Sequence, residues 1–142
     1  GSVDGGVRLY SAPLDGGDEA TLVGTVALGN KGSPVNVVVH PSSTADEVRV
    51  LVATSSGSIE LYKWNGGGEE LKLLTRLESE EGTEFSSGCI HPDGLIYIAG
   101  TKDGSVIVWD LKTQAVAGTL KVSERAVSRG LWLLVLIILH IL

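Results

Sequence analysis

Residues 91–110 constrain the fold of this chain more than any other segment, because they hold two strand patterns joined by strong turn signals. The segment opens with His-Pro-Asp-Gly, in which proline presets φ and glycine tolerates the positive φ of a tight turn. The apolar run 95–99 suits a strand that is buried on both faces. Asp103-Gly104 is then a hairpin signal before a β-branched strand that ends in Trp-Asp. The segment therefore predicts antiparallel β-structure with tight turns.

Composition agrees with an all-β protein, since nineteen glycines in 142 residues supply many turns. The formal net charge is −6 and the basic residues are scattered singly, which argues against a nucleic-acid surface. The densest acidic stretch, residues 78–84, is interpreted as a solvated loop, with a docking site for a basic partner as the alternative. The one cysteine, Cys89, cannot form an internal disulfide, and its apolar strand pattern indicates an inert buried residue.

A short pattern recurs three times along the chain. A hydroxyl residue is followed two positions later by a turn residue, and six positions after that by an aromatic side chain. The first and second aromatics are 52 residues apart, and the second and third are 47 residues apart. These spacings fit WD-repeat blades of about 40–45 residues with enlarged loops. The three sets are Ser2, Asp4 and Tyr10; Thr54, Ser56 and Tyr62; and Thr101, Asp103 and Trp109.

A second marker supports the same frame, because His40-Pro41 and His91-Pro92 each precede the second strand of a repeat. The sequence therefore predicts an all-β, partial WD-repeat β-propeller over residues 1–120, with about two and a half blades of four antiparallel strands. Since propellers close with about 4–8 blades, we expect the chain to be part of a larger propeller. The expected strands are 3–10, 20–27, 35–39, 47–54, 58–62, 71–77, 86–90, 95–100, 105–109 and 115–120.

We interpret the three recurring sets as structural blade networks, because satisfying buried polar groups is the common use of such arrangements. Asp103 is expected to accept hydrogen bonds from neighbouring donors, and the Trp109 indole N–H must find a partner when it is buried. The second set is weaker, since Ser56 stands where an aspartate is usual. Tyr10, Tyr62 and Trp109 are predicted to occupy equivalent places on the third strand of their blades.

Residues 88–97, followed by Gly-Thr-Lys-Asp at 100–103 and by 107–112, resemble the middle blades of the pre-mRNA-processing factor nineteen family. The opening residues 3–11 look like a blade ending in fungal members of that family. Its members are nuclear U-box ubiquitin ligases that scaffold a spliceosome-associated complex. The resemblance implies a nuclear protein-docking region that takes part in mRNA splicing, the ubiquitin conjugation pathway and DNA repair.

The resemblance also limits what this chain can do. In the family, ubiquitin transfer belongs to a U-box and oligomerisation to a coiled coil, and neither is present in these residues. No catalytic residue is therefore carried over, and the implied partners are spliceosomal or ubiquitination proteins. The alternative is a WD-repeat adaptor of another pathway, such as a substrate receptor or a trafficking scaffold.

Patterns typical of enzymes are weak in this sequence. Residues 24–33 superficially match a phosphate-binding loop, but the Gly-Lys-Ser/Thr motif is interrupted and Pro34 follows where a helix should start. His40, His91 and His140 lack the spacing of a zinc site. A nucleophile elbow of the G-x-S-x-G type is absent from the sequence. We therefore expect no catalytic, cofactor or metal site, and no direct nucleic-acid binding.

The pattern changes after Leu120. Residues 131–142 are almost wholly apolar, but a run of twelve interrupted by His140 falls short of the roughly 20 residues that span a membrane. Lys-Val-Ser at 121–123 is what an exon end and a splice donor would encode if they were translated. Our hypothesis is a non-propeller tail over 121–142 that arises from intron read-through. A membrane-tethered protein is the most distant alternative.

Overall fold

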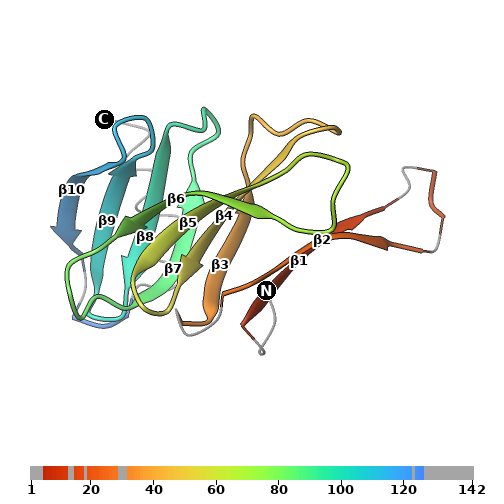
Figure 1. Ribbon diagram of the computed structural model, residues 1–142. Helices are drawn as coiled ribbons and strands as arrows, with labels where there is room; N and C mark the ends of the chain where they lie inside the picture. Colours follow the sequence, from red (N-terminus) through yellow and green to blue (C-terminus); the bar gives the residue numbers. More distant parts are fainter. Residues whose placement is uncertain (1–4, 13–14, 18, 29–31, 123, 127–142) are drawn as a thin grey trace.

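The computed structural model describes residues 5–12, 15–17, 19–28, 32–122 and 124–126. The regular secondary structure in these ranges consists entirely of β-strands (Figure 1). The ten strands form three antiparallel sheets, one of two strands and two of four. This arrangement confirms the expected all-β fold of a partial WD-like propeller. The first sheet pairs β1 (Gly6–Ser11) with β2 (Thr21–Ala27); the second holds β3 (Pro34–Val39), β4 (Val48–Thr54), β5 (Ser58–Trp64) and β6 (Lys72–Glu78); the third holds β7 (Phe85–Ile90), β8 (Ile96–Thr101), β9 (Ser105–Asp110) and β10 (Ala115–Lys121).

The observed strands from β2 to β10 begin and end within two residues of the expected ones. One detail of the sequence interpretation is wrong, because Leu95 lies in the turn before β8 and its side chain is 51% exposed. The buried run is Tyr97–Thr101, two residues further along the chain than the expected run 95–99. The turn residue Gly94 has a φ of 75°, and its N–H donates to the carbonyl of His91 at 2.9 Å. Leu95 therefore belongs to the end of the turn, although its carbonyl still accepts the N–H of Leu111 at 2.9 Å beside the start of β8.

The repeat is visible in the backbone as well as in the side chains. Gly5, Gly57 and Gly104 hold the same place in the frame, and their φ angles are 77°, 83° and 87°. Glycine is required there because other residues disfavour positive φ in these tight turns. Each sheet also shifts register at the residue before its aromatic, between Leu9 and Tyr10 in β1 and between Leu61 and Tyr62 in β5. In the third sheet the register shifts between Val108 and Trp109 of β9, because Trp109 pairs with Val116 and Val108 pairs with Gly118.

The main core lies between the second and third sheets. Large side chains from both sheets meet there, and Phe85 and Tyr97 have no exposed surface. Because side chains of a strand alternate between its faces, the second sheet packs one face against the first sheet and the other against the third. The members of this core are Leu51, Ala53, Ile59, Leu77, Phe85, Tyr97, Ala99, Ile107 and Trp109.

Polar contacts also join the second sheet to the third. The Tyr97 hydroxyl donates to Asn36 Oδ1 at 3.0 Å, so β8 is tied to the inner strand β3. His40 Nδ1 accepts the N–H of Ser42, which leaves Nε2 as the donor to the carbonyl of Gly94 at 2.9 Å. Strands β3 and β7, which are the first strand of the second and of the third sheet, contact each other (Figure 1). These contacts fix the relative position of the two sheets at several points.

The first sheet packs on the opposite face of the second. Val7 and Leu28 share a buried cluster with Val50 and Tyr62. The backbone N–H of Thr25 donates to the carbonyl of Glu69 at 2.8 Å, so β2 also touches the loop before β6. Figure 1 shows β1 and β2 as a separate hairpin beside β3. The three sheets therefore follow one another in chain order, as propeller blades do.

The tail predicted for residues 121–142 is described only in small part. Lys121 is the last residue of β10, and residues 127–142 lie outside the described residues. The hypothesis of intron read-through therefore stays a prediction. None of the described residues forms a helix with the length and apolar character needed to cross a membrane.

Candidate protein-interaction groove

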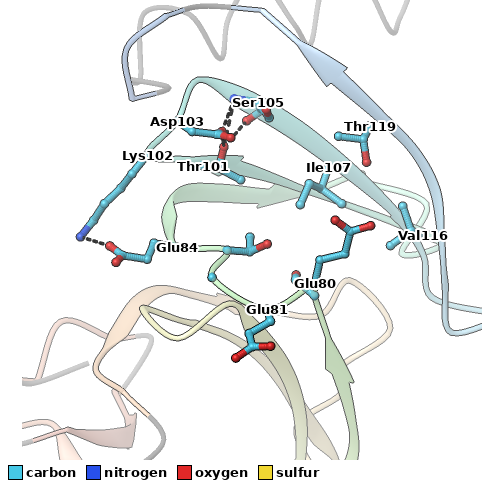
Figure 2. Close-up of a pocket in the computed structure, with 13 residues that line it drawn as sticks. Glu80, Glu81, Glu84, Thr101, Lys102, Asp103, Ser105, Ile107, Val116 and Thr119 are labelled. Atoms are coloured by element: carbon cyan, nitrogen blue, oxygen red, sulfur yellow. Dashed lines mark hydrogen bonds and ion pairs between the residues drawn. The ribbon is translucent and has the colours of Figure 1, made fainter.

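A groove of about 820 Å³ lies where the loop between β6 and β7 faces the third sheet (Figure 2). We call it the β6–β7 groove. Its walls are the loop residues 79–84 and the turn residues Thr101–Asp103 with Ser105, and its apolar part comes from Ile107 and Val116. Thr119 of β10 completes the lining. The acidic stretch noted in the sequence therefore borders a concave surface.

The loop has a defined conformation. The backbone N–H of Ser79 donates to the carbonyl of Gly57 at 3.1 Å, and that of Thr83 donates to Glu80 at 3.1 Å. Gly82 has a φ of 83°, which lets the chain reverse toward β7. These bonds place the loop against the turn of the second sheet and present its acidic side chains beside the third.

The side chains that line the groove carry a net negative charge. Four acidic side chains, Glu80, Glu81, Glu84 and Asp103, and a single cation, Lys102, belong to its lining. Lys102 Nζ lies 2.5 Å from Glu84 Oε2, so that cation is already paired. Figure 2 shows Glu80 directed toward the side of the groove that holds Ile107 and Val116, whereas Glu81 points away from it. Lys121, outside this lining, donates from Nζ to the carbonyl oxygen of Asp103, and after the hydrogen bonds from Thr101 and Ser105 its charge contributes to the lowered pKa of the Asp103 carboxyl. Among the described residues, the negative charges of the lining left without a nearby cation are those of Glu80 and Glu81, and they favour a cationic ligand.

The structure brings Thr101 and Asp103 together at the hairpin turn of the third sheet. The Thr101 hydroxyl donates to Asp103 Oδ1. The backbone N–H of Ser105 donates to Thr101 Oγ1 at 2.9 Å and to Asp103 Oδ1 at 3.0 Å. The Thr101 bond, followed by the bonds from Ser105, lowers the pKa of the Asp103 carboxyl below its ordinary value. This cluster holds the turn in place and forms one wall of the groove.

The second sheet carries the corresponding cluster without a carboxylate. Thr54 Oγ1 lies 2.9 Å from Ser56 Oγ and 2.7 Å from Ser58 Oγ, and Thr54 is fully buried. The N–H of Ser58 reaches Thr54 Oγ1 at 3.3 Å. The substitution of serine for aspartate therefore leaves a neutral network with the same layout.

The structure does not include Trp109 in the third network. Its side chain is 2% exposed, and Nε1 is buried without a hydrogen-bond partner among the described residues. The reason is its place on the sheet. Tyr97 lies directly opposite Trp109 and its hydroxyl bonds to Asn36, while the diagonal neighbour Ala99 carries no polar group. The expectation that the indole finds a partner is therefore wrong for the described part of the chain.

Tyr62 and Trp109 occupy equivalent positions. Tyr62 pairs with Val50 on β4, and Trp109 pairs with Tyr97 on β8. Both partners precede the threonine of their set by four residues, Thr54 in the second sheet and Thr101 in the third. Both aromatic side chains are buried, and each points toward the preceding sheet. Tyr10 lies at the same place on β1 but is 54% exposed. Ser2 and Asp4, the other members of the first set, lie outside the described residues.

Sequence reasoning missed a buried ion pair behind Tyr62. Glu60 has no exposed surface, and Arg76 Nε lies 2.7 Å from its Oε1 atom. The Tyr62 hydroxyl donates to the other oxygen of Glu60. Burial and this bond to Glu60 raise the pKa of Tyr62. The sequence did contain an indication of this pair, because Glu60 falls at a position of its strand where the alternation predicts a buried side chain. A buried glutamate needs a cationic partner, since an unpaired buried charge is costly.

The other candidate chemical groups are accounted for by local structure. Within the described ranges, no three His, Cys, Asp or Glu side chains cluster closely enough to hold a metal ion. His91 Nδ1 lies 3.0 Å from Asp93 Oδ1 in the same turn. Cys89 is half-buried, and burial raises the pKa of its thiol, so the nucleophilic thiolate is disfavoured.

Comparison with known proteins gives a partial match. No model of a known protein family matches the chain. The chain is 29% identical over 113 residues to Pre-mRNA-processing factor 19 from Caenorhabditis elegans. The match covers 59% of this chain and 23% of that protein, so the chain spans less than a quarter of its relative. The similarity agrees with the resemblance seen in the sequence and supports a protein-interaction role, while the fungal and U-box details stay predictions.

Proposed function

We propose that this chain is a protein-docking part of a nuclear splicing scaffold and ubiquitin ligase of the pre-mRNA-processing factor 19 type. The observation that carries the proposal is the match to Pre-mRNA-processing factor 19 over 113 residues of a chain that folds as repeated propeller-like sheets. In this proposal the chain binds substrates or spliceosomal partners, and ubiquitin transfer takes place elsewhere in the assembly.

The structure supports a docking role physically. Two four-stranded sheets share one well-packed core, and the loops at their ends project from this rigid frame. The β6–β7 groove offers a concave surface that combines apolar and acidic side chains. Such a surface suits partner recognition, because apolar contacts supply binding energy and charges select the partner.

Affinity purification of the tagged full chain from nuclear extract tests this proposal. We expect splicing proteins or ubiquitin-pathway proteins to be enriched after nuclease treatment, which removes partners tethered through RNA. Phe85→Asp is a suitable control, because a charge at this fully buried position disrupts the shared core. The proposal fails if the captured proteins belong to trafficking or receptor pathways, and such a result would favour a WD-repeat adaptor of another pathway.

A further inference from the structure

We propose that the β6–β7 groove binds a partner protein through an arginine side chain, whose guanidinium pairs with Glu80 beside Ile107. The inference rests on the proposed docking function and names the chemistry of the segment that docks. Three observations support it: an arginine at the equivalent place in the second sheet, the residues that replace it in the third, and the direction of Glu80.

The first observation is an internal precedent in the second sheet. Glu60 on β5 is directly opposite Arg76 on β6, and the Arg76 guanidinium binds the buried Glu60 carboxylate. Glu60 is two residues before Tyr62 on β5, so its side chain lies on the same face of the sheet as Tyr62, which packs toward the first sheet. At this place in the repeat, therefore, the fold accommodates a guanidinium.

The second observation is that the third sheet lacks this pair. The matching positions on β9 and β10 are Ile107 and Thr119, which are also directly opposite each other. Both line the β6–β7 groove. Isoleucine and threonine are shorter than the glutamate–arginine pair and carry no charge, so a concave surface is present where the second sheet is filled by its own arginine.

The third observation is the placement of negative charge. Figure 2 shows Glu80 directed toward Ile107 and Val116, at the position that a guanidinium in the groove would approach. Glu80 forms no ion pair within the described residues, whereas Glu84 is paired with Lys102. Glu80 of the β6–β7 loop, which faces the third sheet, could therefore bind an incoming arginine as Glu60 binds Arg76 in the second sheet.

Arginine fits this surface better than other cationic groups. Its planar guanidinium binds carboxylates in a fixed geometry and is weakly hydrated, so it tolerates an apolar neighbour such as Ile107. Its aliphatic stem can lie along Val116. A volume of about 820 Å³ accommodates the flanking residues of a short peptide in addition to one side chain. Phosphate-bearing ligands would be repelled by the acidic wall.

An NMR titration of the full ¹⁵N-labelled chain tests the inference. The probe is the peptide acetyl-Gly-Ala-Arg-Ala-Gly-amide, and its citrulline form is the matched control, since citrulline keeps the shape of arginine but carries no charge. We expect the amide signals of Glu80, Ile107 and Thr119 to shift with the arginine peptide. Glu80→Gln should weaken binding about fivefold, the order expected for one partly exposed ion pair.

Two variants separate this mechanism from general attraction to an acidic loop. Glu81→Gln removes the same charge from the neighbouring residue, which points away from the groove, and it should change the affinity less than twofold. The double variant Ile107→Glu with Thr119→Arg places the pair of the second sheet into the third and should abolish binding by filling the groove. Far-UV circular dichroism and thermal melting of each variant show that the fold is retained.

The inference is overturned if the citrulline peptide binds equally well, if Glu80→Gln and Glu81→Gln weaken binding equally, or if the shifts lie outside the groove. A different pattern identifies a failure of the proposed function alone. In that case the arginine peptide binds with the expected dependence on Glu80, while purification of the full chain captures no splicing or ubiquitin-pathway protein.

Discussion

The second and third sheets share one backbone plan but differ in how they fill it. Both have a hydroxyl cluster at the hairpin turn and a buried aromatic on the third strand. The second sheet buries a charged pair, Glu60 and Arg76, whereas the third has Ile107 and Thr119 at these positions. The turn of the second sheet is neutral, whereas that of the third contains the carboxylate of Asp103.

The comparison shows that the repeat specifies backbone geometry and leaves the chemistry of each position free. Positive φ at the turn glycine and the register shift before the aromatic are common to the sheets, because they determine the path of the strands. The path of the strands does not determine which residues form the cross-strand pair two positions before the aromatic, Glu60–Arg76 in the second sheet and Ile107–Thr119 in the third. This cross-strand pair can therefore be an ion pair in one sheet and part of a binding surface in the next.

The largest expected effect comes from breaking the buried pair. Arg76→Thr leaves the fully buried Glu60 carboxylate without its cation, and we expect a loss of about 3–5 kcal/mol in the free energy of unfolding. Adding Glu60→Ile should recover part of this loss, because it removes the unpaired buried charge but also removes the acceptor of the Tyr62 hydroxyl. Chemical denaturation measures both variants. Equal stability of the single and double variants would contradict this account.

The turn glycines should differ between sheets. A Cβ atom on Gly57 would lie 2.5 Å from the carbonyl oxygen of Thr83, whereas one on Gly5 would meet nothing within 4 Å. Both residues have positive φ, which costs about 1–2 kcal/mol for alanine. Gly57→Ala adds a steric clash of about 1–3 kcal/mol. In thermal melting, Gly57→Ala should therefore have a clearly lower melting temperature than Gly5→Ala. The reverse order would show that the loop 79–84 does not pack against this turn.

The unpartnered indole of Trp109 offers a smaller test with the opposite sign. Ala99 lies diagonally across from Trp109 in the same core, so Ala99→Ser supplies an oxygen that can accept the indole N–H. We expect a gain of about 1 kcal/mol in the free energy of unfolding, which urea denaturation measures. Ala53→Ser, at another fully buried alanine of this core, should instead lower stability by roughly 1–3 kcal/mol because its hydroxyl lacks such a donor.

The smallest expected effect concerns acid sensitivity. The pKa of Asp103 is lowered in the folded chain, so its carboxylate supports the fold above its ordinary pKa of 3.8, and this support is lost as pH falls through the folded value. Asp103→Asn should therefore reduce the fall in melting temperature between pH 5 and pH 3. Ser56→Asp should increase that fall by giving the second sheet the carboxylate of the third. If neither variant changes the pH profile, the charge of the turn residue does not contribute to stability.

The sequence by itself determined the periodic features of this protein. Alternating apolar residues, turn glycines and the recurring aromatic are local patterns, and the strand path follows from them without knowledge of distant residues. They predicted the ten strands and the equivalence of Tyr62 and Trp109. The sequence also identified the acidic stretch 78–84, whose residues 79–84 line the groove.

Only the tertiary structure decided which side chains meet across sheets and strands. Glu60 and Arg76 lie on the consecutive strands β5 and β6, and a one-residue change of register would separate them by turning one side chain to the other face. The absence of a partner for Trp109 depends in the same way on Ala99 being its diagonal neighbour. The β6–β7 groove likewise requires the packing of one sheet against the next, because its walls come from a loop between sheets and from the outer strands of the third.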